Sequence, residues 1–528
     1  MKKSLKTKIT TMLLAGILVL SSVGLTGCFE NTTSVDENTV RMMLNGNKPT
    51  GFDEVLEEAN RRSQEEIGIK LKVEWISSGD YKQKLNLKMI AGEEYDLVFD
   101  APFLRLKDLS AEGFYADLGD YFNNPDYPGL QYAFSEKVVE NNKFYGVNCC
   151  IPMMRAYYNG VPAIHYRKDL AKKYGIGTEG QINTYDQFEE YLIAIQDNEK
   201  EMIPLIVSNS RGFYTMFQTS TGDLAKHNIA NLGAGGVTFY MYIEDNEVKA
   251  IAAEGDGDEA FKDFPEPYNY DFNVKRFQKC REWNKYLDPD SLNETDQNNK
   301  FYTGMAGAMI GTLDDTEGVI SNLTAKTPGA ELGEFIHFED VRDMKEGALS
   351  TSFMGNNFLC VPEASKKKDM AMKYMDWLFG SQEVHDLFEL GIEGVNWLPS
   401  KTGDPERYAY AEGNQYTFPG YTMTWNTNYV RFNDLLPDDV VEYRRYETRE
   451  ESFIPSPLAG FIFNTGPVVT EIAKANAVST KVSSLLAHGI LEDPIKAKQD
   501  NVKENRQKGL NVIEEEIVRQ VNEFLANK

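Results

Sequence analysis

Hydrophobic and polar residues alternate between residues 69 and 75, and this period of two predicts a strand with one buried face. Apolar side chains then recur at helical spacing from Asp80 onward, and Gly92 stands where a left-handed helix cap belongs. A short apolar run at residues 96–100 predicts a second, buried strand. Strand, helix and strand with short connections predict a parallel βαβ unit. Because ligands of such sheets bind beyond the carboxyl ends of the strands, the loop that leaves the second strand is a candidate binding segment.

The same patterns extend this unit toward the amino terminus. A strand is expected at residues 39–44 and an amphipathic helix at residues 52–67, so the chain begins as βαβαβ, the start of a doubly wound sheet. Near the carboxyl terminus, helical patterns cover residues 468–487 and 494–526. They lack sustained heptads and therefore predict a packed helical module and not a coiled coil.

The size and charge of the chain limit the number of domains and the kinds of partner that we expect. Its 528 residues exceed what one core holds, so two to four domains are expected. Lysine and arginine number 55 against 81 aspartate and glutamate residues, and the net charge is −26. Because nucleic-acid binding needs a basic surface and the sequence shows no basic stripe, nucleic acid is excluded as the expected partner.

The first 28 residues have the features of an export signal. Four lysines precede a largely apolar stretch at residues 9–25, which is too short and too rich in serine for a membrane span. The stretch ends in Leu-Thr-Gly-Cys, which resembles the bacterial lipobox, where the signal is cut before a cysteine that receives lipid; an ordinary signal peptide is the alternative. We therefore expect a lipid anchor on Cys28, a polar tether over residues 29–38, and a location on the outer face of the cytoplasmic membrane. Loss of the four lysines lowers the net charge from −26 to −30.

The remaining cysteines do not predict a metal site. Cys149, Cys150, Cys280 and Cys360 form no C-x-x-C pair and no cluster with histidine, so we expect buried apolar thiols and no cofactor or metal. A stretch of alternating acids and glycines at residues 254–259 lacks the spacing and the terminal glutamate of a calcium loop, and it is expected to be a solvated turn.

Several motifs resemble family 1 extracellular solute-binding proteins, the sugar-binding lipoproteins of ABC importers. The order of these motifs agrees over most of the chain, although Asn148 stands where the family usually has proline. The matching stretches are DYKQKLNLKMIAGEEYDLVF (80–99), GFYADL (113–118), KFYGV (143–147), HYRKDL (165–170) and FYTGMAGAM (301–309). Two more narrow the resemblance: GIEGVNW (391–397) is similar to a motif of a Gram-positive lipoprotein subgroup, and SPLAGFIF (456–463) resembles the start of its C-terminal module of unknown function.

The resemblance implies an α/β fold with two lobes, of the periplasmic-binding-protein type II class, with several chain crossings and a C-terminal helical module. The implied crossings lie near residues 151–160, 309–314 and 353–359. The implied boundaries are 36–151 and 314–351 for lobe 1, 161–308 and 353–433 for lobe 2, and 434–528 for the module.

Sugar recognition needs aromatic rings for pyranose faces, and amides or carboxylates for hydroxyl groups. Candidates are residues that follow strands or lie at the crossings, because loops on a rigid scaffold carry function; for each, a hinge or capping role is the alternative. These candidate ligand-binding residues are Asn47, Lys48, Asp100, Phe103, Arg155, Tyr157, Asp314, Asn356 and Trp397. The aromatic segment Tyr416–Trp425 is expected either to form a wall of the cleft or to pack beneath the C-terminal module.

The resemblance implies a binding protein and not an enzyme: a monomer that captures a carbohydrate, in particular an oligosaccharide, and delivers it to an ABC permease. A secreted glycoside hydrolase would also need aromatic residues and carboxylates, and a peptide- or lipid-binding surface lipoprotein of the same fold is a further alternative. No G-x-S-x-G, H-E-x-x-H or glycine-rich phosphate loop is present to favour another chemistry.

Overall fold

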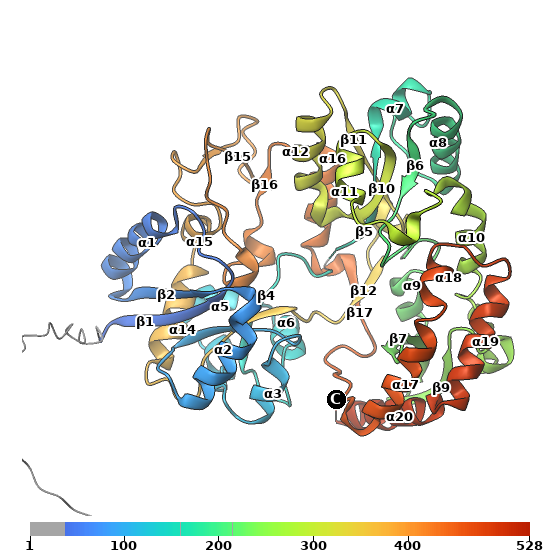
Figure 1. Ribbon diagram of the computed structural model, residues 1–528. Helices are drawn as coiled ribbons and strands as arrows, with labels where there is room; N and C mark the ends of the chain where they lie inside the picture. Colours follow the sequence, from blue (N-terminus) through green and yellow to red (C-terminus); the bar gives the residue numbers. More distant parts are fainter. Residues whose placement is uncertain (1–36, 159, 214, 528) are drawn as a thin grey trace, which may run out of the picture.

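The structure is a computed structural model that describes residues 37–158, 160–213 and 215–527. It shows two α/β lobes side by side, joined near the middle of the molecule by several chain segments (Figure 1). The predicted signal peptide with Cys28, and most of the predicted tether, lie outside the described residues. Within the described part, no helix combines the length and the apolar character that a membrane span requires.

Lobe 1 is built on a mixed five-stranded sheet in the order β2-β1-β3-β13-β4. Its strands are β1 (Thr39–Asn45), β2 (Lys70–Ile76), β3 (Leu97–Asp100), β4 (Cys150–Met153) and β13 (Asn357–Cys360). β1 is parallel to both β2 and β3, which confirms the predicted βαβαβ unit. The helices that cover this lobe are α1 (Phe52–Ile67), α2 (Ser78–Ala91), α3 (Leu106–Ala111), α4 (Gly119–Phe122), α5 (Pro128–Ala133), α6 (Glu136–Asn141), α14 (Lys368–Leu378) and α15 (Gln382–Glu389).

The start of α2 differs from the prediction. Ser77 precedes α2 as its N-cap, and its hydroxyl lies 3.1 Å from the carboxylate of Asp80, so the helix begins earlier than predicted. Its end is as predicted, because Gly92 has φ of 65° and its N–H bonds back to the last turn.

Lobe 2 contains a four-stranded sheet in the order β11-β5-β10-β6. Its strands are β5 (Pro162–Arg167), β6 (Ile203–Ile206), β10 (Ala306–Thr312) and β11 (Leu332–Ile336), and its helices include α7 (Lys168–Lys173), α8 (Tyr185–Asn198), α10 (Arg276–Trp283), α11 (Gln297–Tyr302), α12 (Thr316–Lys326) and α13 (Glu339–Arg342). β5 is antiparallel to both of its neighbours, whereas β6 and β10 are parallel and end at the same edge of the sheet.

The predicted lobe boundaries are wrong in their second halves. Residues 314–351 were expected in lobe 1, but β11 pairs with β5 in lobe 2. Residues 353–433 were expected in lobe 2, but β13 pairs with β3 and β4 in lobe 1, and α14 and α15 pack against α1. The chain therefore does not leave lobe 2 at residues 309–314. It crosses first between β4 and β5, next between β12 (Leu349–Thr351) and β13, and returns where Phe432 and Leu436 pack on Ile320 of α12.

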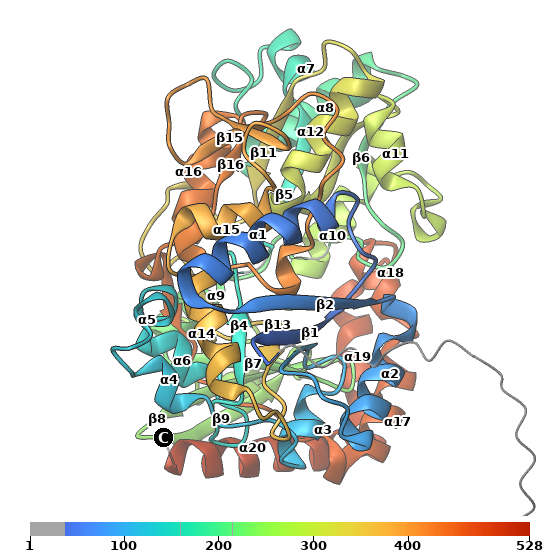
Figure 2. The same ribbon diagram turned by 90° about the vertical axis from the view of Figure 1, so that its left-hand side faces the viewer.

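Two small sheets lie in the later part of the chain. One consists of β14 (Trp397–Pro399), β15 (Arg407–Tyr410) and β16 (Phe432–Asn433), and it leads into α16 (Asp438–Glu447). The other pairs β12 with β17 (Phe453–Pro455) at the junction of the lobes. After β17 the chain enters the C-terminal helices, which Figure 2 shows along the lower part of the molecule.

The C-terminal helices form one layer of a two-layer unit and do not form a separate bundle. They are α17 (Val469–Ser479), α18 (Ser483–Ala487), α19 (Pro494–Gln507) and α20 (Leu510–Ala526). Three of them, α17, α19 and α20, share a core with an antiparallel sheet from the middle of the chain, which consists of β7 (Ile229–Ala234), β8 (Val237–Glu244) and β9 (Glu247–Ala253) and follows α9 (Thr221–Lys226). Leu486 of α18 packs instead with Val274 and with Phe277 of α10. The helices are therefore part of lobe 2.

The acidic stretch at residues 254–259 contributes to this contact and is not a solvated turn. Glu254 is 1% exposed and pairs with Arg276 and with Lys498 of α19. Asp256 pairs with Arg506 of the same helix. The four cysteines in the described residues are free and buried, as expected.

Candidate functional site: cavities at the junction of the lobes

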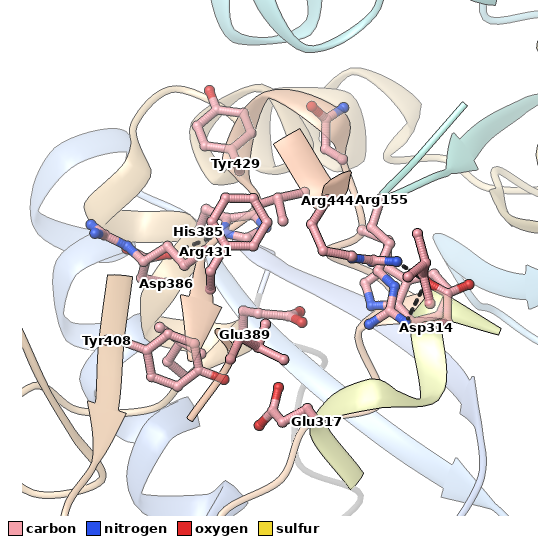
Figure 3. A pocket seen from close by; sticks show the side chains of 17 residues that line it. Arg155, Asp314, Glu317, His385, Asp386, Glu389, Tyr408, Tyr429, Arg431 and Arg444 are labelled. Carbon is pink, nitrogen blue, oxygen red and sulfur yellow. Dashed lines mark hydrogen bonds and ion pairs between the residues drawn. The ribbon is translucent and has the colours of Figure 1, made fainter. Parts of the chain in front are cut away.

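The first cavity has a volume of about 110 Å³ and draws its walls from both lobes (Figure 3). Arg155 comes from the first crossing, and Glu389 and Trp425 come from lobe 1 and the segment that follows it. Asp314 and Glu317 come from the end of β10 and the start of α12 in lobe 2. A ligand in this space would therefore contact both lobes at once.

Asp314 holds three parts of the junction together. One carboxylate oxygen accepts a hydrogen bond from Arg155 at 3.1 Å and another from Arg444 of α16, and the second oxygen accepts from the N–H of Gly160 at 2.9 Å. Burial alone would raise the pKa of Asp314, but the two guanidinium groups hold it below its usual range. Asp314 is thus an anion that connects two points of the first crossing, Arg155 and Gly160, to Arg444 of α16.

One buried and two half-buried carboxyl groups surround this cluster. Arg444 also lies 2.7 Å from Glu447, whose pKa burial raises to about 8. Figure 3 shows Glu317 and Glu389 directed into the space beside the cluster, and burial raises the pKa of both. Carboxyl groups with their oxygens directed into such a space are suitable partners for the hydroxyl groups of a polar ligand.

An aromatic surface adjoins the cavity. The Arg155 guanidinium lies over the ring of Trp425 at 4.5 Å from its centroid, and Trp425 meets Tyr421 edge to face at 5.9 Å. Both rings are partly exposed. The N–H of Met154 donates to the carbonyl of Trp425 at 2.8 Å, which fixes the segment against the first crossing. Of the two roles predicted for Tyr416–Trp425, these residues support the cleft wall, while Tyr416 and Phe418 pack into the core of lobe 1.

A second cavity, of about 570 Å³, lies at the carboxyl edge of the lobe 2 sheet, beyond β6 and β10. It shares Asp314 with the first cavity, so the two adjoin at the end of β10. Its walls carry amide, hydroxyl, guanidinium and carboxylate groups, which can pair with sugar hydroxyls. These side chains are Ser208, Arg211, Gln297, Asn298, Tyr302, Asp315 and Asn322.

A third cavity, of about 300 Å³, lies among the crossings and contains two more of the predicted residues, Tyr157 and Asn356. Tyr157 is 8% exposed, and its N–H donates to the carbonyl of Glu447 at 3.1 Å. The structure therefore distributes four predicted residues over the three cavities: Arg155 lines the first, Asp314 lines the first and the second, and Tyr157 and Asn356 line the third.

The structure gives Asp100 a role in the fold. Asp100 is fully buried, and its carboxylate accepts hydrogen bonds from the N–H groups of Ala101 and Arg105 and, at 2.6 Å, from the hydroxyl of Tyr115. Burial raises its pKa to about 6. No face of this carboxylate is left for a ligand, so the predicted binding role is replaced by a structural one.

Trp397 is also structural. It is 5% exposed and packs with Leu390 and Tyr408, and its indole N–H donates to the carbonyl of Gly391 at 3.0 Å. The motif around it folds upon itself, which explains why a tryptophan in a turn-rich stretch is buried.

The loops of lobe 1 supply the remaining candidates. Lys48 pairs with Asp53 at 2.6 Å on the surface, and Phe103 is 63% exposed in the loop after β3. Asn47 follows β1 in the same loop as Gly46, where an added Cβ would lie 3.8 Å from the Tyr421 hydroxyl. None of the three lines one of the cavities described above, and their contact with a ligand remains a proposal.

Sequence reasoning missed most of the cavity-lining residues. Glu317, Glu389 and Arg444 are charged residues on α12, α15 and α16, and a charged residue on a helix is ordinarily predicted to face solvent. Only the fold places them together, because their neighbours come from crossings that are far apart in the chain. Within the described residues, no three histidine, cysteine or carboxylate side chains are grouped as a metal site would require.

Comparisons with known proteins agree with this architecture. Residues 45–384 match the bacterial extracellular solute-binding protein family, and residues 457–526 match a domain of unknown function (DUF3502). A carbohydrate ABC transporter substrate-binding protein of Streptococcus pneumoniae is 24% identical over 516 residues, which are 94% of this chain and 92% of that protein.

Among solved structures, the N-glycan transport solute-binding protein of Streptococcus pneumoniae superposes with a TM-score of 0.69 at 19% identity, over 93% of this chain and 100% of that one. A solute-binding protein from Bifidobacterium longum infantis, described as binding HMO and associated with an ABC transporter, superposes with a TM-score of 0.55 at 15% identity, over 93% and 99% of the two chains. These similarities confirm the predicted two-lobed fold. Since the family match spans well over half of the chain, the protein belongs to the bacterial extracellular solute-binding proteins.

Proposed function

We propose that the protein is a lipid-anchored extracellular receptor that captures a carbohydrate, in particular an oligosaccharide, and delivers it to the permease of an ABC importer. The observation that carries this proposal is the composition of the adjoining cavities. An aromatic wall at Trp425 and Tyr421 meets hydrogen-bonding side chains from both lobes, around Asp314. Aromatic faces with hydroxyl-binding groups are what a pyranose ring requires.

The relatives support the ligand class. The similar proteins of Streptococcus pneumoniae and Bifidobacterium carry names that refer to carbohydrate, N-glycan or HMO. The combined extent of the first and second cavities, which meet at Asp314, favours a ligand of more than one sugar unit. No bond is made or broken in this proposal, since the ligand only selects a conformation in which both lobes contact it.

The binding assay uses residues 28–528 with serine in place of Cys28. Thermal shift against a panel of plant, host and microbial oligosaccharides identifies a ligand, and calorimetry then measures its Kd. We expect at least one oligosaccharide to bind and to be recovered unchanged by chromatography.

Release of reducing ends would instead favour a glycoside hydrolase. Glu317 and Glu389 are the carboxyl groups that such an enzyme would use in the first cavity, because both lie there with a raised pKa. Loss of that release in Glu317→Gln would establish the hydrolase and contradict our proposal. Binding of peptides or lipids with no response to any sugar would also contradict it.

The anchor is tested separately. Cells that express the full chain are fed a radiolabelled or clickable palmitate, and the protein is followed by detergent phase partition. We expect label and membrane association in the natural sequence and neither in Cys28→Ala. Equal membrane association of the two proteins would contradict a lipid anchor at this residue.

A further inference from the structure

The segment Ser208–Phe213 connects β6 to the rest of lobe 2 and forms part of the second cavity. Ser208, Arg211 and Gly212 line that cavity, whereas Phe213 points inward and is 1% exposed. The N–H groups of Arg211 and Gly212 bond to the carbonyl of Ser208, so the segment is a tight turn. Its position determines where the cavity-lining side chains of this wall lie.

The C-terminal helices contact this turn directly. The N–H of Phe213 donates to the carbonyl of Ala487, the last residue of α18, at 2.8 Å. Gly212 has φ of +52°, and an added Cβ would lie 2.4 Å from the same carbonyl oxygen. The backbones are therefore packed without space for a side chain, and the contact fixes the turn in one position.

The residues that follow Ala487 are attached to the body of lobe 2. The side-chain amide of Asn284 donates to the carbonyl of His488 at 2.8 Å. Gly489 has φ of +66°, and an added Cβ would lie 2.0 Å from the carbonyl oxygen of Cys280 in α10. The turn Ala487–Gly489 thus lies between α10 and the cavity wall.

We propose that the C-terminal helical region positions the ligand: its turn Ala487–Gly489 sets the place of Ser208–Phe213 and thereby tunes the affinity and selectivity of the second cavity. The proposal rests on the proposed function, because it assigns that cavity to ligand binding. The turn itself does not line the second cavity, so its residues are positioning residues.

The test compares glycine variants in the mature chain. Gly489→Ala displaces the turn, and Asn284→Ala removes its side-chain anchor with less strain. Gly236→Ala is the matched control: it also has positive φ, at +72°, and its Cβ would lie 2.6 Å from Ser479 of α17, but it is in the β7–β8 turn and lines none of the three cavities at the junction.

We expect all three variants to melt at a lower temperature, whereas only Gly489→Ala and Asn284→Ala raise the Kd, by threefold or more. The ratio of the Kd values for two sugars of the panel should change in the same two variants. Gly489→Ala should also have a smaller effect in an Arg211→Ala background, because residues that act through one segment are not additive. A folded Gly489→Ala and Asn284→Ala with natural Kd values and natural selectivity would overturn the proposal.

Hydrogen exchange at the Phe213 amide separates this proposal from the proposed function. Faster exchange in Gly489→Ala, with no change in Gly236→Ala, is expected because the acceptor on Ala487 moves. Unchanged exchange in Gly489→Ala would overturn the positioning role even if sugars bind. Expected exchange in a protein that binds no sugar would count against the proposed function and leave the contact between turn and wall established.

Discussion

Trp397 and Trp425 differ in what their indole rings contact, although both lie in turn-rich segments of the same region. Trp397 is enclosed by Leu390 and Tyr408, and its N–H is bonded to a backbone carbonyl. Trp425 is partly exposed, borders the first cavity and has a guanidinium over one face. A tryptophan whose N–H and faces are used inside the protein stabilises the fold, whereas one with a free face can bind a ring of the ligand.

Replacement of Trp425 by alanine should weaken binding of the sugar found in the panel. The lost stacking contact is worth about 0.5–1.5 kcal/mol beyond buried area, which corresponds to a Kd roughly 2- to 12-fold higher by calorimetry. Trp397→Ala is the control: it should lower the free energy of unfolding by about 3–5 kcal/mol and leave the Kd of the folded fraction unchanged. A raised Kd in Trp397→Ala, with an unchanged Kd in Trp425→Ala, would instead place Trp397 in the binding site.

Asp100 should make stability depend on pH. Its pKa is about 6 in the folded protein against 3.8 as the ordinary value. Below about pH 4 the carboxyl is protonated in both states. As pH rises toward 6 the unfolded chain loses this proton first, so the contribution of Asp100 to the free energy of unfolding falls, by about 3 kcal/mol in total.

The variant Asp100→Asn lacks this titration. It should compare least well with the natural protein at pH 4, where the natural carboxyl is neutral and its raised pKa contributes most to stability. Its deficit should shrink between pH 4 and pH 6 and then stay constant, as measured by urea unfolding across that range. Parallel curves for the two proteins would show that the Asp100 carboxyl is not perturbed.

The C-terminal helices supply one side of a hydrophobic core whose other side is the β7–β9 sheet. Ile513, Ile517 and Val521 of α20 are fully buried against the β7–β9 sheet. Beside this apolar layer, Glu254 is buried between Arg276 and Lys498, a contact that joins the sheet to α19. The residues that match the domain of unknown function therefore share a hydrophobic core with the β7–β9 sheet.

This arrangement predicts that single substitutions in α20 destabilise lobe 2. Ile517→Ala should lower the free energy of unfolding by about 2–5 kcal/mol, because a large buried side chain leaves a cavity. Val512→Ala is the control, since Val512 lies on the same helix but is 47% exposed, and surface changes stay within about 0.5 kcal/mol. Chemical unfolding followed by circular dichroism measures both, and equal losses would contradict the shared core.

The sequence predicts elements better than it predicts their neighbours. α1 and the parallel strands around it follow from periodicity, because a strand or helix that buries one face carries that period in its own residues. The sheet positions of β11 and β13 cannot be predicted from periodicity, since a short buried strand can pair with any sheet edge of suitable length. The same reason explains the site: Arg155 lies at a chain crossing and Asp314 follows a strand, positions that the sequence indicates, whereas Glu389 has neither position.

At the scale of the molecule, the junction combines a polar cluster with a small number of chain crossings. Asp314 joins Arg155 to Arg444 at the point where both lobes border the first cavity. A ligand that contacts walls from both lobes favours the conformation in which those walls approach each other. Ligand binding should therefore shorten the distance between the two lobes.

Fluorescence energy transfer can measure that distance with few changes to the chain. The four described cysteines are at most 2% exposed, so cysteines introduced on the surface are labelled selectively. Asp108 of α3 and Lys474 of α17 are 59% and 51% exposed, and Figure 1 shows α3 in lobe 1 and α17 in lobe 2. With Asp108→Cys and Lys474→Cys, saturating sugar should raise the transfer efficiency, because the hinge closes around the ligand. The pair Asp108→Cys and Asp53→Cys lies within lobe 1 and should show no change, so a response there, or none between the lobes, would contradict closure as a hinge motion.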